Sequence, residues 1–261
     1  MNMLCRRPEL AAALLVFAAD AAALAPPQMS LGKQIAPVPP PHPVTRRSLA
    51  GLAAFGSTAG PLVDSVHNQC LLKYDVLPIE IPCGIWNAQT SLLIPPLLAL
   101  TYALLGAVLP AACEFVVGSG RTLEPPAGSL SPRARAALAV ASTIGIIKLS
   151  ELLTLSALPA LGSLALLLAC CLLQWAVLDG ALASLLLAIV VAIGGPLAEI
   201  PFMQLGCWHY ISPDYFPLAS WLGDGIGGLS SLTGPCYFAV TTDAIALGRW
   251  LGSDAQGEDA G

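Results

Sequence analysis

Four side chains capable of acid/base chemistry lie in apolar or aromatic stretches of the sequence. Glu199 and Asp243 interrupt runs of small and aliphatic residues, and His209 shortly precedes Asp214 in an aromatic segment. Carboxyl and imidazole groups in an apolar site can act as general acids or bases, so these residues could serve an enzyme. A single His among Trp and Tyr is more typical of an anchor at a membrane surface. We therefore assign no catalytic residue from the sequence.

Charged side chains within apolar runs require partners or water. Lys148 and Glu151 are spaced i,i+3 on one helical face, which predicts a structural ion pair rather than a ligand contact. Glu199 and Asp243 have no evident basic partner in the sequence. They face a wet cavity, pair with each other while protonated, or lie nearer the membrane surface than the apolar runs indicate.

The cysteines indicate neither a metal centre nor a disulfide framework. Cys170 and Cys171 lie in an apolar run, and Cys5 lies in a targeting segment. The other cysteines lack metal-ligand spacing and are expected to be buried free thiols: Cys70, Cys83, Cys113, Cys207 and Cys236. We predict no metal and no cofactor.

The composition is that of a multi-pass membrane protein. Apolar residues make up 56% of the 261 residues and charged residues only 10%, and the mean hydropathy is +0.76. A soluble domain of this length would need more charge to cover its surface. The sequence also has no basic stripe with interleaved aromatic residues, so we expect no binding to nucleic acid.

Six apolar stretches predict an all-α integral membrane protein, a bundle of six transmembrane helices within a membrane domain at 48–251. Each is long enough, or nearly so, to cross a hydrocarbon core of about 30 Å. Gly194-Gly195-Pro196 predicts a kink or a close helix contact. The predicted helices cover 48–66, 91–113, 133–155, 160–178, 181–205 and 235–251.

The two ends of the chain differ from this domain. Residues 1–25 have the Arg-bearing, apolar and small-residue regions of a signal peptide, and the stretch that follows is poor in acids and contains Ser, Arg and Pro. We interpret 1–47 as a targeting or flexible segment, either with a second, plastid-type element or with a flexible tail after the signal peptide. Residues 252–261 are predicted to be an acidic disordered tail.

The segment 207–222 is the densest in aromatic residues. Its Ser212-Pro213-Asp214 sequence is typical of a turn, and the polar-tipped rings beside it suit a membrane–water interface. We therefore predict a belt at the bilayer surface, where one helix ends and the next begins. Its rings with a polar tip belong to Trp208, His209, Tyr210, Tyr215 and Trp221.

The distribution of Lys and Arg predicts an orientation. Six helices place Arg46, Arg47, Arg121, Arg133, Arg135 and Arg249 on one side, and the opposite connections contain one Lys and no Arg. By the positive-inside rule, the Arg-rich side is cytoplasmic.

Several motifs together resemble the Insig proteins, the six-span endoplasmic-reticulum proteins that sense oxysterol and retain sterol-regulatory partners. The most specific is the aromatic-Ser-Pro-Asp-aromatic sequence followed by Ser-Trp-Leu. The matching residues are Ile94-Pro95-Pro96, Gly106 to Pro110, Trp175, Asp179, Tyr210 to Tyr215, Ser220-Trp221-Leu222, Pro235-Cys236, Gly248-Arg249 and Leu251.

This sequence also departs from the family. Gly180 and Ala181 follow Asp179 where the family has Arg and Ser, and residues 223–233 are an insertion. Glu199 and Asp243 are charges outside the family pattern. We therefore expect this chain to share the fold of the family, and we infer the family's regulatory partners for it less firmly than that fold.

The resemblance implies a non-enzymatic membrane regulator that binds a sterol or isoprenoid lipid and docks a membrane partner, Scap-like or reductase-like. By the same resemblance, Asp179 and Trp175 bind the partner; alternatively, Asp179 is the N-cap of the following helix. The family location is the endoplasmic reticulum, and the N-terminus leaves a plastid membrane as the alternative. The candidate lipid-cavity residues are Pro95, Pro96, Lys148, Glu151, Glu199 and Asp243.

Two other functions fit parts of the sequence. One is an integral-membrane enzyme of lipid or isoprenoid metabolism, which would bring carboxylates and His209 together at one cavity. A transporter would require repeated halves with discontinuous helices, and no such repeat is evident.

Overall fold

The computed structural model describes residues 44–67, 70–82, 87–120, 122–217 and 227–258. Most of the predicted targeting segment 1–47 lies outside these residues, as do Cys83, which is predicted to be a free thiol, Arg121 of the Arg-rich side and the belt residue Trp221.

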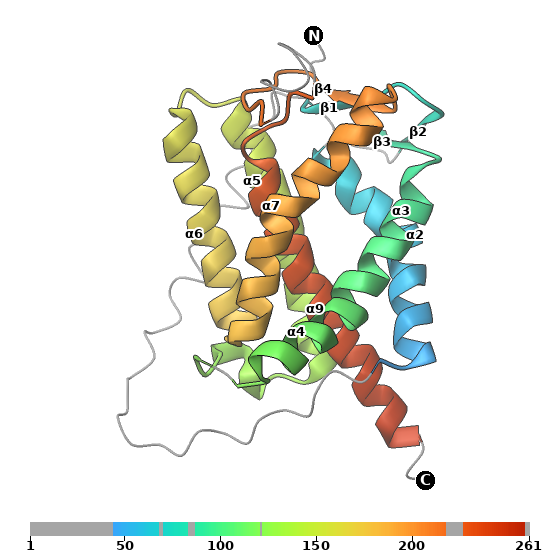
Figure 1. Cartoon of the computed structure of the whole chain (residues 1–261), viewed down its shortest axis with the longest axis vertical. Coiled ribbons are helices and arrows are strands. Elements are labelled where there is room, and N and C mark those ends of the chain that lie inside the picture. The colour runs from blue at the N-terminus through green and yellow to red at the C-terminus, as the bar shows by residue number, and fades with distance from the viewer. Residues whose placement is uncertain (1–43, 68–69, 83–86, 121, 218–226, 259–261) are drawn as a thin grey trace.

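Six helical passes run alternately up and down through the described part of the chain (Figure 1). The second pass combines two α-helices with a short π-helical segment, η2, between them. The helical elements are α2 (Arg46–His67), α3 (Ile94–Ala103), η2 (Leu104–Val108), α4 (Leu109–Val117), α5 (Pro132–Thr154), α6 (Ala160–Leu178), α7 (Leu182–Gln204) and α9 (Thr233–Glu258).

Four of these passes are long and apolar enough to cross a membrane: Ile94–Val117, Pro132–Thr154, Ala160–Leu178 and Leu182–Gln204. The first and last passes, α2 and α9, contain more polar residues. Among them are Asp64 on α2 and Asp243 on α9. The α9 helix also continues to Glu258, so the helix end predicted at Leu251 is too early. No Pro lies between Leu251 and Glu258, so nothing in this stretch breaks the helix in that way.

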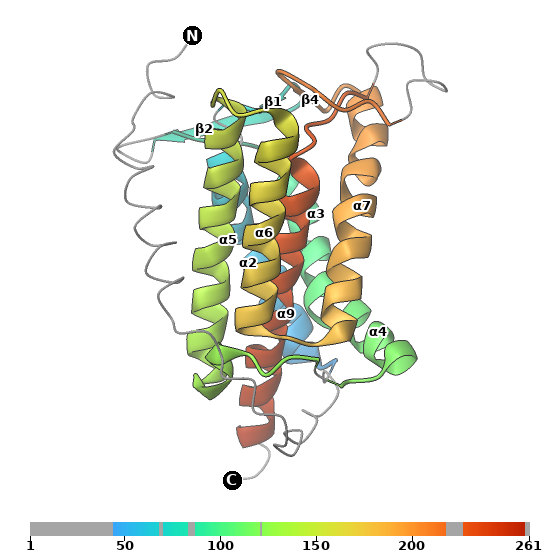
Figure 2. The same cartoon turned by 90° about the vertical axis from the view of Figure 1, so that its left-hand side faces the viewer.

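The α9 helix lies at the centre of the bundle, where it contacts α2, α5, α6, α7 and η2 (Figure 2). Glycines allow the closest of these approaches. A Cβ atom on Gly248 would lie 1.8 Å from the carbonyl oxygen of Gly106 in η2, and a Cβ on Gly106 would lie 2.6 Å from the Ala244 carbonyl oxygen. Only glycine at both positions lets the two backbones meet.

The small residues of α7 also permit close packing, as the sequence predicts. A Cβ atom on Gly195 would lie 2.4 Å from the ring of Tyr237 on α9. The helix continues through Pro196 and Pro201 to Gln204. The contact at Gly195 confirms the predicted close helix contact, which was the alternative to a kink.

Two small antiparallel sheets lie at one end of the bundle, so the all-α prediction is wrong in this detail. β1 (Leu72–Tyr74) pairs with β4 (Trp208–Tyr210), and β2 (Pro78–Pro82) pairs with β3 (Asn87–Ser91). The first and third residues of β4 are buried and the middle one is exposed. This alternation is that of a strand, and part of the predicted aromatic belt therefore packs inward.

The two ends of the bundle differ in charge. The α2 and α5 helices begin, and α4 and α9 end, at the end opposite to the sheets (Figure 1). The Arg residues near these helix ends therefore gather on one side, as the six-pass topology predicts.

Among the described residues, the cysteines follow the prediction of free thiols with one exception, whereas the predicted burial holds for Cys236 but not for Cys113 and Cys207, which are partly exposed. Cys113, Cys170, Cys171, Cys207 and Cys236 are free. Cys70 is disulfide-bonded, so the prediction of a free thiol is wrong there. It lies in the connection between α2 and β1, where spacing along the sequence gave no pairing signal.

Candidate functional site

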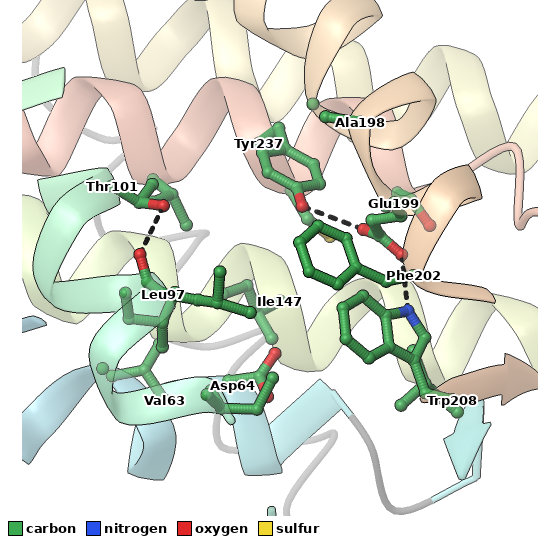
Figure 3. Close-up of a pocket in the computed structure, with 18 of the residues that line it drawn as sticks. Val63, Asp64, Leu97, Thr101, Ile147, Ala198, Glu199, Phe202, Trp208 and Tyr237 are labelled. Atoms are coloured by element: carbon green, nitrogen blue, oxygen red, sulfur yellow. Dashed lines mark hydrogen bonds between the residues drawn. The ribbon is translucent and has the colours of Figure 1, made fainter. Parts of the chain in front are cut away.

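A pocket of about 330 Å³ lies between the helices near the sheet end of the bundle. Its lining comes from α2, α3, η2, α5, α7 and α9 and from strands β1 and β4. Most of this lining is apolar, and Figure 3 shows Val63, Leu97, Ile147 and Phe202 among the contributing side chains. Both its size and its apolar walls are typical of small-molecule sites.

Glu199 is the polar centre of the pocket. Its Oε1 accepts a hydrogen bond from the Tyr237 hydroxyl at 2.9 Å. Its Oε2 accepts hydrogen bonds from the Tyr210 hydroxyl at 3.0 Å and from the indole Nε1 of Trp208 at 3.3 Å. Figure 3 shows the carboxyl group held between Tyr237 and Trp208. Three elements, α7, β4 and α9, thus meet at one side chain.

The local sequence explains this geometry. Trp208 and Tyr210 are two residues apart on a strand, so both side chains face the same way, toward α7. Tyr237 reaches Glu199 because the neighbouring Gly195 leaves room for its ring. Trp208 is held further by stacking on Phe202, with ring centroids 5.2 Å apart.

Tyr210 provides a second connection between the Glu199 carboxyl group and α9, in addition to the one through Tyr237. Its hydroxyl oxygen accepts a hydrogen bond from Thr233 Oγ1 at 3.0 Å. Burial, together with the nearby Glu199 carboxylate, raises the pKa of the Tyr210 phenol well above its ordinary value. Tyr210 therefore remains a hydrogen-bond donor to Glu199.

A second carboxyl group lines the pocket from α2. Asp64 Oδ2 accepts a hydrogen bond from the hydroxyl of Tyr74 on β1 at 2.5 Å. Sequence reasoning missed Asp64, although it is the one charged residue in the first predicted helix, 48–66. A carboxyl group within a membrane helix is a candidate functional residue on that ground alone.

Of the six predicted cavity residues, only Glu199 lines this pocket. Lys148 and Glu151 form the predicted ion pair on α5, with Nζ and Oε2 2.5 Å apart. Pro95 and Pro96 lie in the first turn of α3, and their neighbours Ile94, Leu97 and Leu98 face the pocket instead.

Asp243 lies elsewhere on α9. It is buried, and neither carboxyl oxygen has a hydrogen-bond partner among the described residues. Its polar neighbours are Tyr102 and Thr143. The alternative in which Asp243 pairs with Glu199 is wrong, because the partners of Glu199 are Tyr and Trp side chains.

The other described residues of the aromatic segment, up to Pro217, do not line this pocket. His209 faces outward from β4, and its Nδ1 lies 2.6 Å from Asp75 Oδ2. Asp214 accepts hydrogen bonds from the backbone and hydroxyl of Ser231. A His209–Asp214 acid/base pair is therefore ruled out by geometry. Ser212, Pro213 and Tyr215 belong to the loop after β4, and Tyr215 pairs with Leu229 in a short β-bridge.

The two predicted partner-binding residues lie at the opposite end of the bundle. Asp179 is buried and forms an ion pair with Arg249 of α9, whose guanidinium also lies 3.7 Å from Glu114. Trp175 is buried as well, and its indole Nε1 donates to the Ala181 carbonyl oxygen and to Ser184 Oγ.

Asp179 is not an N-cap, so that alternative for its role is wrong. The residue before the first turn of α7 is Ala181, which makes no side-chain cap. Gly180, with a φ of +66°, turns the chain between Asp179 and Ala181. Asp179 itself ends α6. This turn directs its carboxyl group toward α9 instead of toward the amides of α7.

Two solved structures are similar to this chain. One is the crystal structure of a mycobacterial Insig homolog, MvINS from Mycobacterium vanbaalenii, with a TM-score of 0.56 and 24% identity over 79% of this chain and 95% of that chain. The other is a cross-linked trimer of a cysteine variant of MvINS, with the same TM-score and coverage and 25% identity. The chain has an Insig-like fold. No family model matches the sequence, and a search of curated proteins gave no match.

The Insig-like fold confirms the resemblance seen in the sequence motifs. Together with the four apolar passes, it establishes an integral membrane protein. The pocket at Glu199 and the Asp179–Arg249 pair thus lie toward opposite ends of an Insig-like bundle.

Proposed function

We propose that this Insig-like protein is a non-enzymatic membrane regulator that binds a sterol or isoprenoid lipid in the Glu199 pocket and docks a membrane partner at the opposite end. The observation that carries this proposal is an apolar pocket with a small polar centre inside an Insig-like bundle. A sterol would fit a pocket with apolar walls and one polar centre, because its rings and tail suit the walls and its hydroxyl suits the polar centre.

The α9 helix provides a physical connection between the two ends. Tyr237 and Thr233 of α9 take part in the hydrogen bonds around Glu199, and Arg249 of the same helix pairs with Asp179. Tyr237 and Arg249 lie roughly 18 Å apart along the helix axis, at about 1.5 Å per residue. A bound lipid favours docking only if it interacts better with the docking-competent position of α9.

The proposed docking surface is the turn between α6 and α7. Because Asp179 and Trp175 are buried, their role there is to fix the shape of this turn. The partner would be Scap-like or reductase-like by the family resemblance. For the location we propose the endoplasmic reticulum, with a plastid membrane as the alternative.

Thermal unfolding in detergent tests the lipid part of the proposal. A sterol added to the full-length protein should raise the unfolding temperature in a saturable way, since a ligand that binds only the folded state stabilises it. Glu199→Ala should reduce that rise, whereas Glu80→Ala, at an exposed carboxyl on β2, should leave it unchanged. Equal shifts in all three proteins would count against a sterol in this pocket.

One observation favours a second function, an integral-membrane enzyme acting on a lipid. Asp64 and Glu199 both line the same pocket, as the acid/base hypothesis requires, although His209 does not. Incubation of the purified protein with membrane lipid extract, followed by mass spectrometry, separates the two functions. Product formation that is lost in both Glu199→Gln and Asp64→Asn would favour the enzyme.

A further inference from the structure

A second pocket, of about 210 Å³, lies at the sheet end of the bundle and shares no described lining residue with the Glu199 pocket. It is formed where α5 ends and α6 begins (Figure 1), by the loop after β4 and by the loop before α9. Its lining is rich in hydroxyl groups, and among its described residues Asp214 is the only charged one. The hydroxyl groups belong to Thr154, Ser156, Ser163, Ser212, Ser230 and Ser231.

Two of these serines are buried and have a hydroxyl hydrogen without an acceptor among the described residues. Ser163, in the first turn of α6, is 3% exposed, and Ser230, before α9, is 6% exposed. The Ser230 oxygen accepts the amide hydrogen of Leu232 at 3.3 Å, which leaves its own hydrogen free. No side chain caps α6, so the amides of its first turn are further donors. A buried donor without an acceptor is unfavourable, and a group inside the pocket can supply that acceptor.

Other side chains of the lining offer acceptor oxygens. The Asp214 carboxyl is held by the amide of Ser231 at 2.6 Å and by its hydroxyl at 2.7 Å. Thr154 and Ser156 donate their hydroxyl hydrogens to backbone carbonyl oxygens of α5. Their oxygens, like those of the carboxyl group, still have lone pairs for a ligand. The pocket therefore presents donors and acceptors together.

This mixture decides which chemical class fits. A hydroxyl group donates one hydrogen bond and accepts others, so a ligand with several neighbouring hydroxyls satisfies both sets. A phosphate or carboxylate would bring acceptors and negative charge beside Asp214, and the described lining contains no Lys, Arg or His to compensate. An ammonium group would offer no acceptor to Ser163 and Ser230. The chemistry therefore favours a neutral polyhydroxy group.

The size and place of the pocket suit a head group rather than a whole ligand. Its volume of about 210 Å³ is below the ~300 Å³ at which sites that enclose a whole small molecule begin. It lies beside the ends of two apolar passes, Pro132–Thr154 and Ala160–Leu178. Passes of this kind end where lipid head groups meet water. Leu158, which lines the pocket and is 53% exposed, gives an apolar contact to the adjoining part of a lipid.

We propose that this pocket binds the neutral polyhydroxy head group of a membrane lipid, such as a sugar. Ser163 and Ser230 donate hydrogen bonds to its oxygens, and Asp214 accepts them from its hydroxyls. The site goes beyond the proposed function at Glu199 and does not depend on it. Three of its lining residues, 230–232, belong to the stretch 223–233, which the sequence predicts to be an insertion relative to the Insig pattern.

Three lipids with the same two oleoyl chains test the head-group preference: glucosyl dioleoylglycerol, dioleoylglycerol and dioleoylphosphatidic acid. Each is titrated into the full-length protein in a polyoxyethylene detergent, which contains no sugar. Native mass spectrometry measures binding, and thermal unfolding is the second measurement. The glucosyl lipid should bind roughly tenfold more tightly than either of the other lipids, as a few additional hydrogen bonds would produce. Methyl glucoside, which has no chains, should bind far more weakly than the glucosyl lipid.

Variants connect the preference to the two buried serines. Ser163→Ala and Ser230→Ala should each weaken binding of the glucosyl lipid by about two- to tenfold, the range for one hydrogen bond. Ser163→Ala should leave the unfolding temperature of the lipid-free protein unchanged, because its hydroxyl has no partner among the described residues. Ser129→Ala, at an exposed serine near the opposite end, and Glu199→Ala, in the other pocket, should both leave the preference unchanged.

The outcomes that overturn this proposal are distinct. Equal affinities for the three lipids, or a preference for phosphatidic acid, would contradict a polyhydroxy site. Methyl glucoside binding as tightly as the glucosyl lipid would make the ligand a free sugar instead of a lipid. A preference that is kept in both serine variants and lost in Glu199→Ala would place the glucosyl lipid in the other pocket. Because the two serine variants are independent, misfolding of one leaves the test intact.

Discussion

Tyr237 of α9 donates its hydroxyl hydrogen to Oε1 of Glu199 on α7 at 2.9 Å. This bond joins the central helix of the bundle to the polar centre of the pocket. It also depends on Gly195, one turn before Glu199, which leaves space for the tyrosine ring.

Tyr237→Phe should destabilise the protein. The change removes one donor from a carboxyl group that has three, and loss of a hydrogen bond to such a group costs about 1–3 kcal/mol. The measurement is thermal or denaturant unfolding in detergent. Tyr215→Phe is the matched control, because Tyr215 is exposed in the loop after β4. Similar losses in both variants would argue against a structural role for the Tyr237–Glu199 bond.

Two adjacent glycines of α7 provide an internally controlled comparison. Gly195→Ala places a Cβ atom 2.4 Å from the Tyr237 ring, whereas a Cβ atom on Gly194 meets nothing within 4 Å. We expect Gly195→Ala to cost about 1–3 kcal/mol through overpacking and Gly194→Ala to be neutral or mildly stabilising. Equal unfolding temperatures for the two variants would contradict the close contact between α7 and α9.

Asp179→Ala should destabilise the folded protein more than the loss of a helix cap would. It leaves the Arg249 guanidinium with Glu114 as its remaining carboxyl neighbour among the described residues, and breaking a largely buried ion pair costs about 3 kcal/mol. Asp179→Ser, which could restore an N-cap, should not restore stability, because Asp179 caps no helix. Glu124→Ala, at an exposed residue near the same end, is the control.

The Asp179 variants also test the connection to a partner. If the pair fixes the docking turn, Asp179→Ala and Arg249→Ala should both reduce co-purification of the partner. Retained co-purification in both variants would show that docking does not depend on this ion pair.

The orientation in the membrane has its own test. Arg residues gather at the end where α9 terminates, and the disulfide-bonded Cys70 lies at the sheet end, which suits an oxidising compartment. Protease added to sealed microsomes should therefore remove a tag placed after residue 261. Protection of that tag, with loss only after detergent treatment, would reverse the proposed orientation.

Local patterns in the sequence predict much of the helical architecture. Apolar runs predict the six passes, the i,i+3 spacing predicts the Lys148–Glu151 pair, and small residues predict the close contact at Gly195. Each of these signals is carried by residues near one another in the chain.

The polar centre of the pocket could not be predicted in the same way. Glu199 has its partners on β4 and α9, and β4 is a strand only because it pairs with β1, which is distant in sequence. Three-residue strands have too short a pattern to distinguish from a polar loop. The Asp179–Arg249 pair likewise depends on how α6 and α9 pack.

The most direct test of the proposed function is to locate a bound sterol by photoaffinity labelling. A sterol with a photoactivatable group is cross-linked to the full-length protein, and the labelled peptides are identified by mass spectrometry. We predict saturable labelling of peptides from α3, α7 and α9 that line the pocket, with loss of the label when unmodified sterol competes. Labelling confined to outward-facing residues such as Leu161 and Leu173 of α6, without competition, would contradict a sterol site in this pocket.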